Sequence, residues 1–231
     1  MSGMADLIIT IDGPAASGKS TVARLLARKL GASFLDTGAM YRAVTLAAMR
    51  AGVDLNDEQK LLDITQTCKF QFSIKAGKMT VHIDNTDVTG QIRSPEVTAN
   101  ARYIAAAPRV REKLVQMQRQ FASDRHKIVT EGRDQGTVVF GNADIKFYLT
   151  ADSPERARRR QAELRDKGAA VESLEQIQKA IEQRDKSDEN RTVGPLKPAE
   201  DAIIVDTTNM SIEQVVEKLA YHVKEKCSKR T

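Results

Sequence analysis

Residues 11–26, IDGPAASGKSTVARLL, constrain the fold more than any other part of the chain. From Gly13 to Ser20 they fit the pattern G-x-x-x-x-G-K-[ST], in which backbone N–H groups converge on phosphate oxygens. The apolar run Leu7–Ile11 (LIITI) before it is typical of a strand buried on both faces. The stretch Lys19–Leu30 after it keeps its apolar residues on one helical face. A strand, a glycine-rich turn and a helix in this order predict a phosphate-binding loop.

The rest of the chain alternates short apolar strands with amphipathic helices. Further strands are expected at Ser33–Leu35, Lys127–Thr130, Ile145–Leu149 and Ala202–Val205, and further helices at 38–51, 108–121, 153–167, 174–185 and 211–226. Ser153 and Pro154 are expected as the cap and first residue of one helix, and Ser211 with Gln214 as the capping box of the last. This alternation predicts a parallel sheet covered by helices on both faces.

One segment has a different pattern. Residues 69–75 (KFQFSIK) and 79–83 (MTVHI) alternate apolar and polar side chains, and a glycine-containing turn, AGK, joins them. This pattern predicts a hairpin with one solvated face, and we interpret about 67–102 as an insertion outside the main sheet. The expected fold class is therefore α/β, a P-loop NTPase-type parallel sheet with a small antiparallel insertion.

Composition restricts the class of protein. A chain of 231 residues suits one domain, and its net charge of +5 favours anionic ligands, although basic and acidic residues are interspersed as on a solvated surface. No window approaches the roughly 18 apolar residues of a membrane span, and residues 1–13 do not resemble a signal peptide. Cys68 and Cys227 form no C-x-x-C pair. We expect a cytoplasmic protein that binds neither membranes nor nucleic acid.

Several residues of the glycine-rich loop have an expected role. Lys19 would place a positive charge on the β and γ phosphates, the Ser20 hydroxyl can ligate Mg²⁺, and Thr21 would lie near the α phosphate. The expected nucleotide-binding residues are Gly13, Pro14, Ala15, Ala16, Ser17, Gly18, Lys19, Ser20 and Thr21.

Arginines recur where the chain leaves a strand or begins a helix. Arg133 and Asp134 directly follow an expected strand, at the edge where open α/β sheets bind ligands. The others are Arg42, Arg109, Arg111, Arg156, Arg158, Arg159, Arg160, Arg184 and Arg191. Singly, each could be a solvated ion pair worth at most about 1 kcal/mol. Together they predict a site for two phosphorylated ligands that meet end to end.

The absent motifs exclude several classes of enzyme. The sequence has no N-K-x-D motif of a GTPase, no Ser/His/Asp arrangement, and no metal-ligand spacing among its three histidines. No strong general base is evident. Transfer to a phosphate acceptor needs none, because the phosphate oxygen is already ionised.

These motifs resemble those of the bacterial cytidylate kinases, in the nucleoside monophosphate kinase superfamily. The shared stretches are DGPAASGKST, LDTGAMYR, DVTGQIRSPEV, APRVRE, EGRDQGTVVF and RDKSDENR followed by PL, in the family's order from about residue 7 to 212. The resemblance implies a CORE, a nucleotide-monophosphate region at about 37–108 that contains the insertion at about 67–102, and a LID at about 153–192. It implies a monomer that transfers the ATP γ-phosphoryl group to CMP or dCMP with Mg²⁺.

The resemblance also implies residue roles. The substrate-binding residues would be Asp36, Thr37, Arg42, Arg102, Arg111, Arg133, Asp134, Arg184, Asp188 and Arg191, and the catalytic residues Lys19, Arg133, Arg156, Arg159 and Arg160. Among them, Arg42 and Arg133 would hold the acceptor phosphate, Arg111, Asp134 and Arg191 the cytosine, and Arg184 and Asp188 the sugar. The chain departs from some family members, which have Ser in place of Arg102 and of Ala15.

Hydrogen bonding supports the choice of base. Cytosine presents an amino donor beside two acceptors, so the Asp134 carboxylate can accept from it while arginines donate. Uracil would set its O4 acceptor against the same carboxylate, at a cost of about 1–3 kcal/mol.

Two alternatives stay open. One is a kinase for another acceptor, either UMP or a hydroxyl-bearing metabolite for which Asp36 is the candidate base. The other is a nucleotide-dependent module that binds nucleic acid, suggested by the charge of +5 and the run Arg158–Arg160. The low aromatic content of 4% disfavours that module, because base stacking needs aromatic side chains.

Overall fold

The computed structural model describes residues 6–75, 77–166, 168 and 172–228. Its strands are β1 (Leu7–Asp12), β2 (Ser33–Asp36), β3 (Phe70–Lys75), β4 (Lys78–Ile83), β5 (Thr86–Asp87), β6 (Lys127–Glu131), β7 (Ile145–Thr150) and β8 (Ile203–Asp206). Its helices are α1 (Lys19–Leu30), α2 (Thr37–Arg50), α3 (Glu58–Thr67), η1 (Gln91–Arg93), α4 (Pro95–Ala106), α5 (Pro108–Ser123), η2 (Gln135–Val139), α6 (Ser153–Asp166), α7 (Leu174–Glu189) and α8 (Ile212–Ser228). Parts of three expectations above lie outside the described residues. They are Lys167 of the expected helix at 153–167, Ala76 of the AGK turn, and residues 1–5 of the N-terminal stretch.

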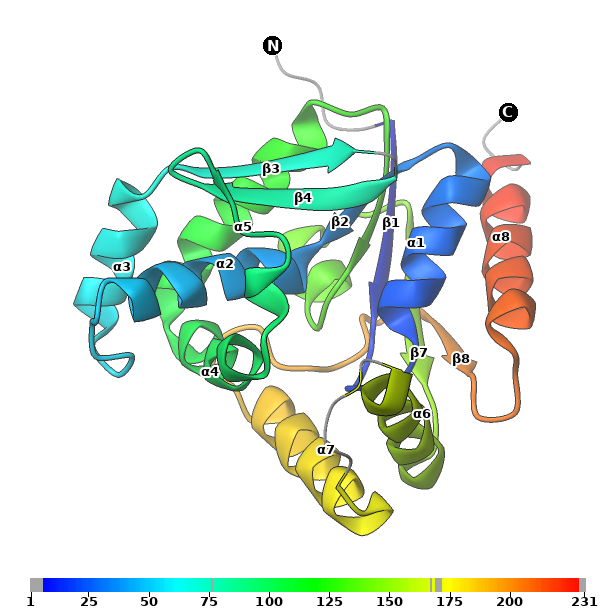
Figure 1. Cartoon of the computed structure of the whole chain (residues 1–231). Coiled ribbons are helices and arrows are strands. Elements are labelled where there is room, and N and C mark those ends of the chain that lie inside the picture. The colour runs from blue at the N-terminus through cyan, green and yellow to red at the C-terminus, as the bar shows by residue number, and fades with distance from the viewer. Residues whose placement is uncertain (1–5, 76, 167, 169–171, 229–231) are drawn as a thin grey trace.

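The main sheet is parallel, with the strand order β2-β6-β1-β7-β8 (Figure 1). In its register, Leu7 of β1 lies opposite Lys127 of β6, and Ile9 lies opposite Ile145 of β7. The predicted α/β class is confirmed. Because the carboxyl ends of parallel strands meet at one edge, the segments that follow β1, β2 and β6 lie together there.

Helices cover both faces of this sheet. Successive side chains of a strand point to opposite faces, so the apolar residues of β1 need cover on both sides. Ile9 and Ile11 of β1 are fully buried in a cluster with α1 and α8. Ile8 belongs to the opposite cluster, which contains Met40 of α2 and Leu114 of α5. Figure 1 shows α1 and α8 on one side of the sheet and α2 and α5 on the other.

The insertion forms a second, antiparallel sheet with the order β3-β4-β5. Phe70 pairs with Ile83 and Ile74 with Met79, so the predicted hairpin is confirmed. Met79 and Ile83 are buried on one side of β4, where this strand packs against α2 and β2. The insertion is thereby fixed to the strand and helix that carry Asp36 and Arg42.

Several local details differ from the sequence expectations. Helices α3 and α4 were not predicted, and α7 continues to Glu189 rather than ending at Asp185. The cap of α6 is Asp152, whose Oδ1 accepts the N–H of Glu155 at 2.9 Å, and not Ser153. The Ser153 hydroxyl donates to Glu182 on α7 instead.

The start of the last helix agrees with the sequence. The Ser211 N–H donates to Gln214 Oε1 at 2.9 Å and the Gln214 N–H to Ser211 Oγ at 3.2 Å, which confirms the predicted capping box.

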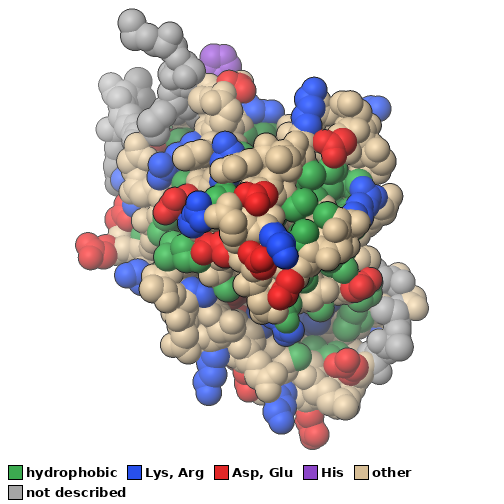
Figure 2. Space-filling view, turned by 90° about the vertical axis from the view of Figure 1, so that its left-hand side faces the viewer, with side chains coloured by type: hydrophobic (Ala, Val, Ile, Leu, Met, Phe, Trp, Pro, Cys, Tyr) green, Lys and Arg blue, Asp and Glu red, His purple; other side chains and the backbone are tan. Residues whose placement is uncertain are grey.

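The surface mixes charges of both signs. Figure 2 shows basic, acidic and apolar side chains interspersed over one face of the molecule. Among the described residues, no helix combines the length and apolar character needed to cross a membrane.

Candidate active site

The glycine-rich loop connects β1 to α1 and has backbone angles that only glycine adopts readily. Gly13 has φ 145°, and a Cβ there would collide with the backbone of Leu149 on β7. Gly18 precedes α1 in the left-handed region, with φ 87°. These glycines allow the loop to turn tightly at the end of β1, so that α1 begins at Lys19 with its free N–H groups at the loop.

Lys19 is buried inside this loop. Its Nζ donates to the Pro14 carbonyl and, at 3.2 Å, to Ser17 Oγ. Burial, and after it the nearby Arg133 guanidinium, lower the pKa of Lys19 well below its usual value. A phosphate in the loop would raise the pKa of Lys19, because a nearby anion favours the charged form.

Ser20 and Glu131 bring two oxygen donors together where α1 faces the end of β6. The Ser20 hydroxyl donates to Glu131 Oε1 at 2.8 Å. Burial, followed by the neighbouring Asp36 carboxylate, raises the pKa of Glu131. A hydroxyl and a carboxylate suit Mg²⁺, which takes oxygen ligands and completes its shell with water and phosphate. The described residues contain no group of three or more His, Cys, Asp or Glu side chains around a metal position, so the chain would supply only part of that shell.

A second group of charges surrounds Asp36, at the end of β2. Its carboxylate caps α2 by accepting the Ala39 N–H at 2.8 Å, and it pairs with Arg93 at 2.9 Å and Arg42 at 3.4 Å. Burial opposes ionisation here, but the two arginines lower the pKa of Asp36 below its usual value. Asp36 thus stays a carboxylate with two cations beside it. The Arg42 Nε atom is buried and has no hydrogen-bond partner among the described residues.

Arginines just after β6, on α7 and just after α7 form a third group around the Asp188 carboxylate. Arg133 Nε donates to Asp188 Oδ2 at 2.8 Å, and Arg191 approaches the other oxygen of Asp188 at 3.2 Å. Desolvation, and after it Arg133, lower the pKa of Arg184 to about 10. Arg184 makes no ion pair within the part of the chain that the structure describes. This excess of positive charge is suited to an anionic ligand.

Arg111 and Asp134 form a buried pair beside this group. They are 2% and 4% exposed, and Arg111 donates to Asp134 Oδ2. The Arg111 guanidinium also lies over the Tyr41 ring, 5.6 Å from its centroid. Gly194, with φ 62°, packs its backbone against both partners, and a Cβ there would collide with each of them. The pair is therefore held in one orientation, with the Arg111 N–H donors beside the Asp134 carboxylate oxygens.

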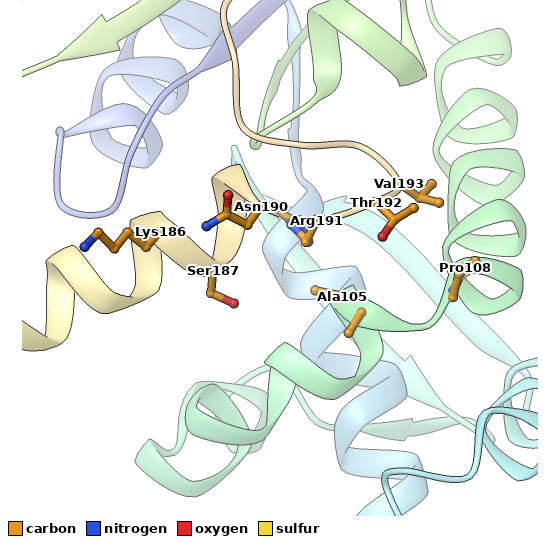
Figure 3. Close-up of a pocket in the computed structure, with 9 residues that line it drawn as sticks. Ala105, Pro108, Lys186, Ser187, Asn190, Arg191, Thr192 and Val193 are labelled. Carbon is orange, nitrogen blue, oxygen red and sulfur yellow. The ribbon is translucent and has the colours of Figure 1, made fainter.

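A cavity of about 400 Å³ lies between the junction of α4 and α5 and the end of α7. Figure 3 shows Arg191 at this cavity with Ala105 from α4 and Pro108 from α5. Arg191 thus connects the cavity with Asp188 and the arginines around it.

The hairpin of α6 and α7 is joined to the phosphate-binding loop by a buried ion pair. Arg156 of α6 donates to Asp185 of α7 and, at 3.1 Å, to the Ala15 carbonyl. Asp185 Oδ1 accepts the Ala15 N–H at 2.9 Å. Two helices that follow β7 are thereby held directly on the loop that follows β1.

The chain is similar to proteins of one family over most of its length. Residues 9–225 match the family model described as "Cytidylate kinase". The chain belongs to the cytidylate kinase family. "Cytidylate kinase" of Limosilactobacillus reuteri (strain DSM 20016) is 48% identical, covering 94% of this chain and 95% of that protein. "Cytidylate kinase" of Rhodopirellula baltica is 47% identical, covering 95% and 93%.

A solved structure shares the fold alone. The crystal structure of an uncharacterized protein from Eubacterium ventriosum ATCC 27560 has a TM-score of 0.53 and 11% identity, and the match covers 94% of this chain and 98% of that one.

In this member of the cytidylate kinase family, most of the expected site residues lie at one edge of the sheet. Arg102, by contrast, is exposed on α4 and lies over its neighbour Tyr103. Arg159 donates to the Thr207 carbonyl at 2.6 Å, and Arg160 pairs with Glu163 on its own helix. Arg156 is thus the expected α6 arginine that contacts the loop.

Sequence reasoning missed several residues of the site. They are Asp12, Arg93, Glu131 and Asp185. The position of Glu131, at the end of an apolar strand and just before the conspicuous Arg133, was an available signal. The contacts of the other three depend on parts of the chain that are distant in sequence.

Proposed function

We propose that the protein transfers the γ-phosphoryl group of ATP to CMP or dCMP, giving CDP or dCDP and ADP. The observation that carries the proposal is the cluster of arginines, only partly paired with carboxylates, beside a phosphate-binding loop at one sheet edge. The relatives named cytidylate kinase support the same acceptor. The protein is proposed to act as a cytoplasmic monomer.

The donor would bind in the loop. The N–H groups from Gly13 to Ser20 and the Lys19 ammonium would hold the β and γ phosphates. Mg²⁺ would be held by Ser20 with Glu131, and it would supply neutralising charge on the phosphate oxygens. We assign residues 153–192 as the LID, because α6 and α7 are already joined to the loop through Arg156 and Asp185.

The acceptor would bind beyond the loop. Arg42 and Arg133 would hold its phosphate in line with the donor, in the region of about 37–108 and at the end of β6. An ionised oxygen of that phosphate attacks the γ phosphorus, the bond to the β–γ bridging oxygen breaks, and ADP leaves. Catalysis would come from positioning and from positive charge around the transferring group.

The surroundings of Asp36 disfavour a hydroxyl acceptor. Such an acceptor needs a base near the γ phosphate, and Asp36 was the candidate. Its lowered pKa makes it a weak base, and its oxygens already accept from the Ala39 N–H and the two arginines. The buried Arg111–Asp134 pair offers the donors and the acceptor that the cytosine edge requires.

A panel of acceptors tests the proposal. Purified protein with ATP and Mg²⁺ is given CMP, dCMP, UMP, AMP, GMP or shikimate, and ADP is measured in a coupled assay. We expect CMP and dCMP to be turned over with kcat/KM at least tenfold above UMP, because uracil leaves a buried acceptor unpaired. Consumption of another acceptor with CMP untouched would contradict it.

A further inference from the structure

Asp12 is a buried carboxylate that the phosphate-binding pattern does not require. It is the last residue of β1, directly before Gly13, and its side chain is 4% exposed. Its Oδ1 accepts the Gln135 N–H at 2.9 Å, and its Oδ2 accepts the Gly136 N–H at 2.8 Å. One side chain at the start of the donor loop therefore binds the backbone of a different segment.

That segment is the turn that carries two residues of the acceptor site. Arg133 and Asp134 directly precede η2, whose first two residues are Gln135 and Gly136. The first N–H groups of a helix have no partner within it, so they need an acceptor from outside. Asp12 supplies one oxygen to each of the two.

Other contacts leave this turn little freedom on its remaining sides. The Gln135 side chain accepts from Thr130 Oγ1 at 2.8 Å and donates to Gln118 Oε1 at 3.1 Å. A Cβ added to Gly136 would lie 2.9 Å from Thr10 Oγ1 on β1, so the turn is packed tightly against that strand. The Asp12 carboxylate is thus the polar link in a close contact between β1 and the turn.

We propose that Asp12 is a positioning residue, whose carboxylate sets the Arg133–Asp134 turn, and with it the acceptor nucleotide, at the correct place relative to the donor loop. The inference rests on the proposed function. In-line transfer depends strongly on such placement, since a displacement of about 1 Å can cost on the order of 100-fold in rate. Only a carboxylate of this length offers an acceptor to both N–H groups.

Asp12→Asn is the direct test, because it keeps the shape and removes one acceptor. The Asn amide would accept from one N–H group and turn its own NH₂ toward the other. We expect kcat/KM for CMP to fall at least tenfold and the preference for CMP over UMP to shrink. The KM for ATP should change less than about threefold, since the N–H groups of the loop itself are untouched.

Asp144→Asn is the matched control. Asp144 accepts a backbone N–H of the same strand, from Ile8 at 2.6 Å, but it lies just before β7, away from the sheet edge that carries the loop. We expect the Asp144→Asn variant to have the same KM values and base preference as the wild type. The control separates a general effect of losing a carboxylate that bonds to β1, or lies on it, from the specific effect at the turn.

The outcomes are distinguishable. Unchanged CMP kinetics in Asp12→Asn, or an equal rise of both KM values with the base preference retained, would overturn the inference. If the wild type itself fails to phosphorylate CMP, the proposed function fails instead. Should Asp12→Asn lack a cooperative melting transition, Gly136→Ala displaces the same turn from the Thr10 side. A wild-type KM for CMP and base preference in that variant would equally overturn the inference.

Discussion

Arg133, just after β6, lies among buried side chains of both charges. Its guanidinium lies near Lys19, Arg184 and one shared carboxylate, Asp188, which with the other acidic neighbours raises the pKa of Arg133 despite its burial. Asp188 is shared with Arg191, so this carboxylate neutralises the Arg133 guanidinium only in part. The Arg133 guanidinium therefore stays charged and can bind a second anion.

Replacing Arg133 with Ala tests this assignment. We expect turnover with CMP to fall more than tenfold, because the acceptor phosphate loses a cation, while the melting temperature stays within a few degrees of the wild type. Arg158→Ala is the control, since Arg158 is largely exposed and pairs with Glu155 on its own helix. Wild-type turnover in Arg133→Ala would count against the assignment.

Asp12 also predicts a pH dependence of stability. Burial raises the pKa of Asp12 to about 7; Asp134 raises it too, whereas the two N–H groups and Lys19 lower it. The unfolded chain ionises near 3.8, so the folded chain holds the proton more tightly. The stability from this proton is complete below the unfolded pKa and is lost as pH rises through 7.

Urea unfolding at pH 6 and pH 8 measures that loss. We expect the wild type to lose roughly 1 kcal/mol more than Asp12→Asn over this interval, because the variant has no proton to release. An equal loss in both proteins would show that Asp12 does not titrate there.

At the scale of elements, the α6–α7 hairpin depends on its attachment to the donor loop. The buried Arg156–Asp185 pair joins the two helices, and both side chains bind the backbone of Ala15. Removing one partner of a buried pair typically costs about 3–5 kcal/mol. Here the lost free energy would mainly weaken the packing of the hairpin on the donor loop, because this pair joins α6 and α7 to that loop.

Asp185→Ala should therefore loosen the hairpin without unfolding the sheet. We expect the KM for ATP to rise several-fold, and ATP hydrolysis without an acceptor to increase relative to transfer, since a closed LID excludes water. Both rates are measured as ADP release with and without CMP. Glu217→Gln, an exposed change on α8, is the control. An equal ratio of the two rates in both variants would contradict this role of the Arg156–Asp185 pair.

The strands and helices of the core were predictable because each carries its own local signal. β1 is mostly apolar, and α1 begins after a glycine pattern that specifies its start. α4 was missed because PEVTANARYIAA buries only Val97 and Ile104, too few for a clear helical period. The cap of α6 was misplaced by one residue because Asp152 and Ser153 are both good caps.

The site was less predictable than the fold for a physical reason. The loop from Gly13 to Ser20 is contiguous, so its pattern is visible in the sequence. The pair of Arg111 with Asp134 and the bond from Asp12 to Gln135 join residues 23 and 123 positions apart. Such contacts exist only once β1, β6 and α5 have packed, and no local pattern specifies them.

The whole molecule is predicted to remain a monomer. Its exposed large apolar side chains are scattered over different segments: Val138, Leu174, Val193, Ile204, Ile212 and Tyr221. Stable interfaces between copies need a contiguous apolar centre, and charges of both signs separate apolar side chains on the face in Figure 2. Light scattering during gel filtration should give 25.5 kDa at both low and high micromolar concentration. A mass near twice that value would contradict the prediction.

The order of strands has a consequence for synthesis on the ribosome. β1 emerges first, but its neighbours in the sheet start only at Lys127 and Ile145. The apolar side chains of β1 therefore stay without their partner strands while the intervening chain is translated, exposed to aggregation and to chaperones. A nascent chain that ends before Lys127 would contain the whole phosphate-binding loop but neither of the strands that pair with β1.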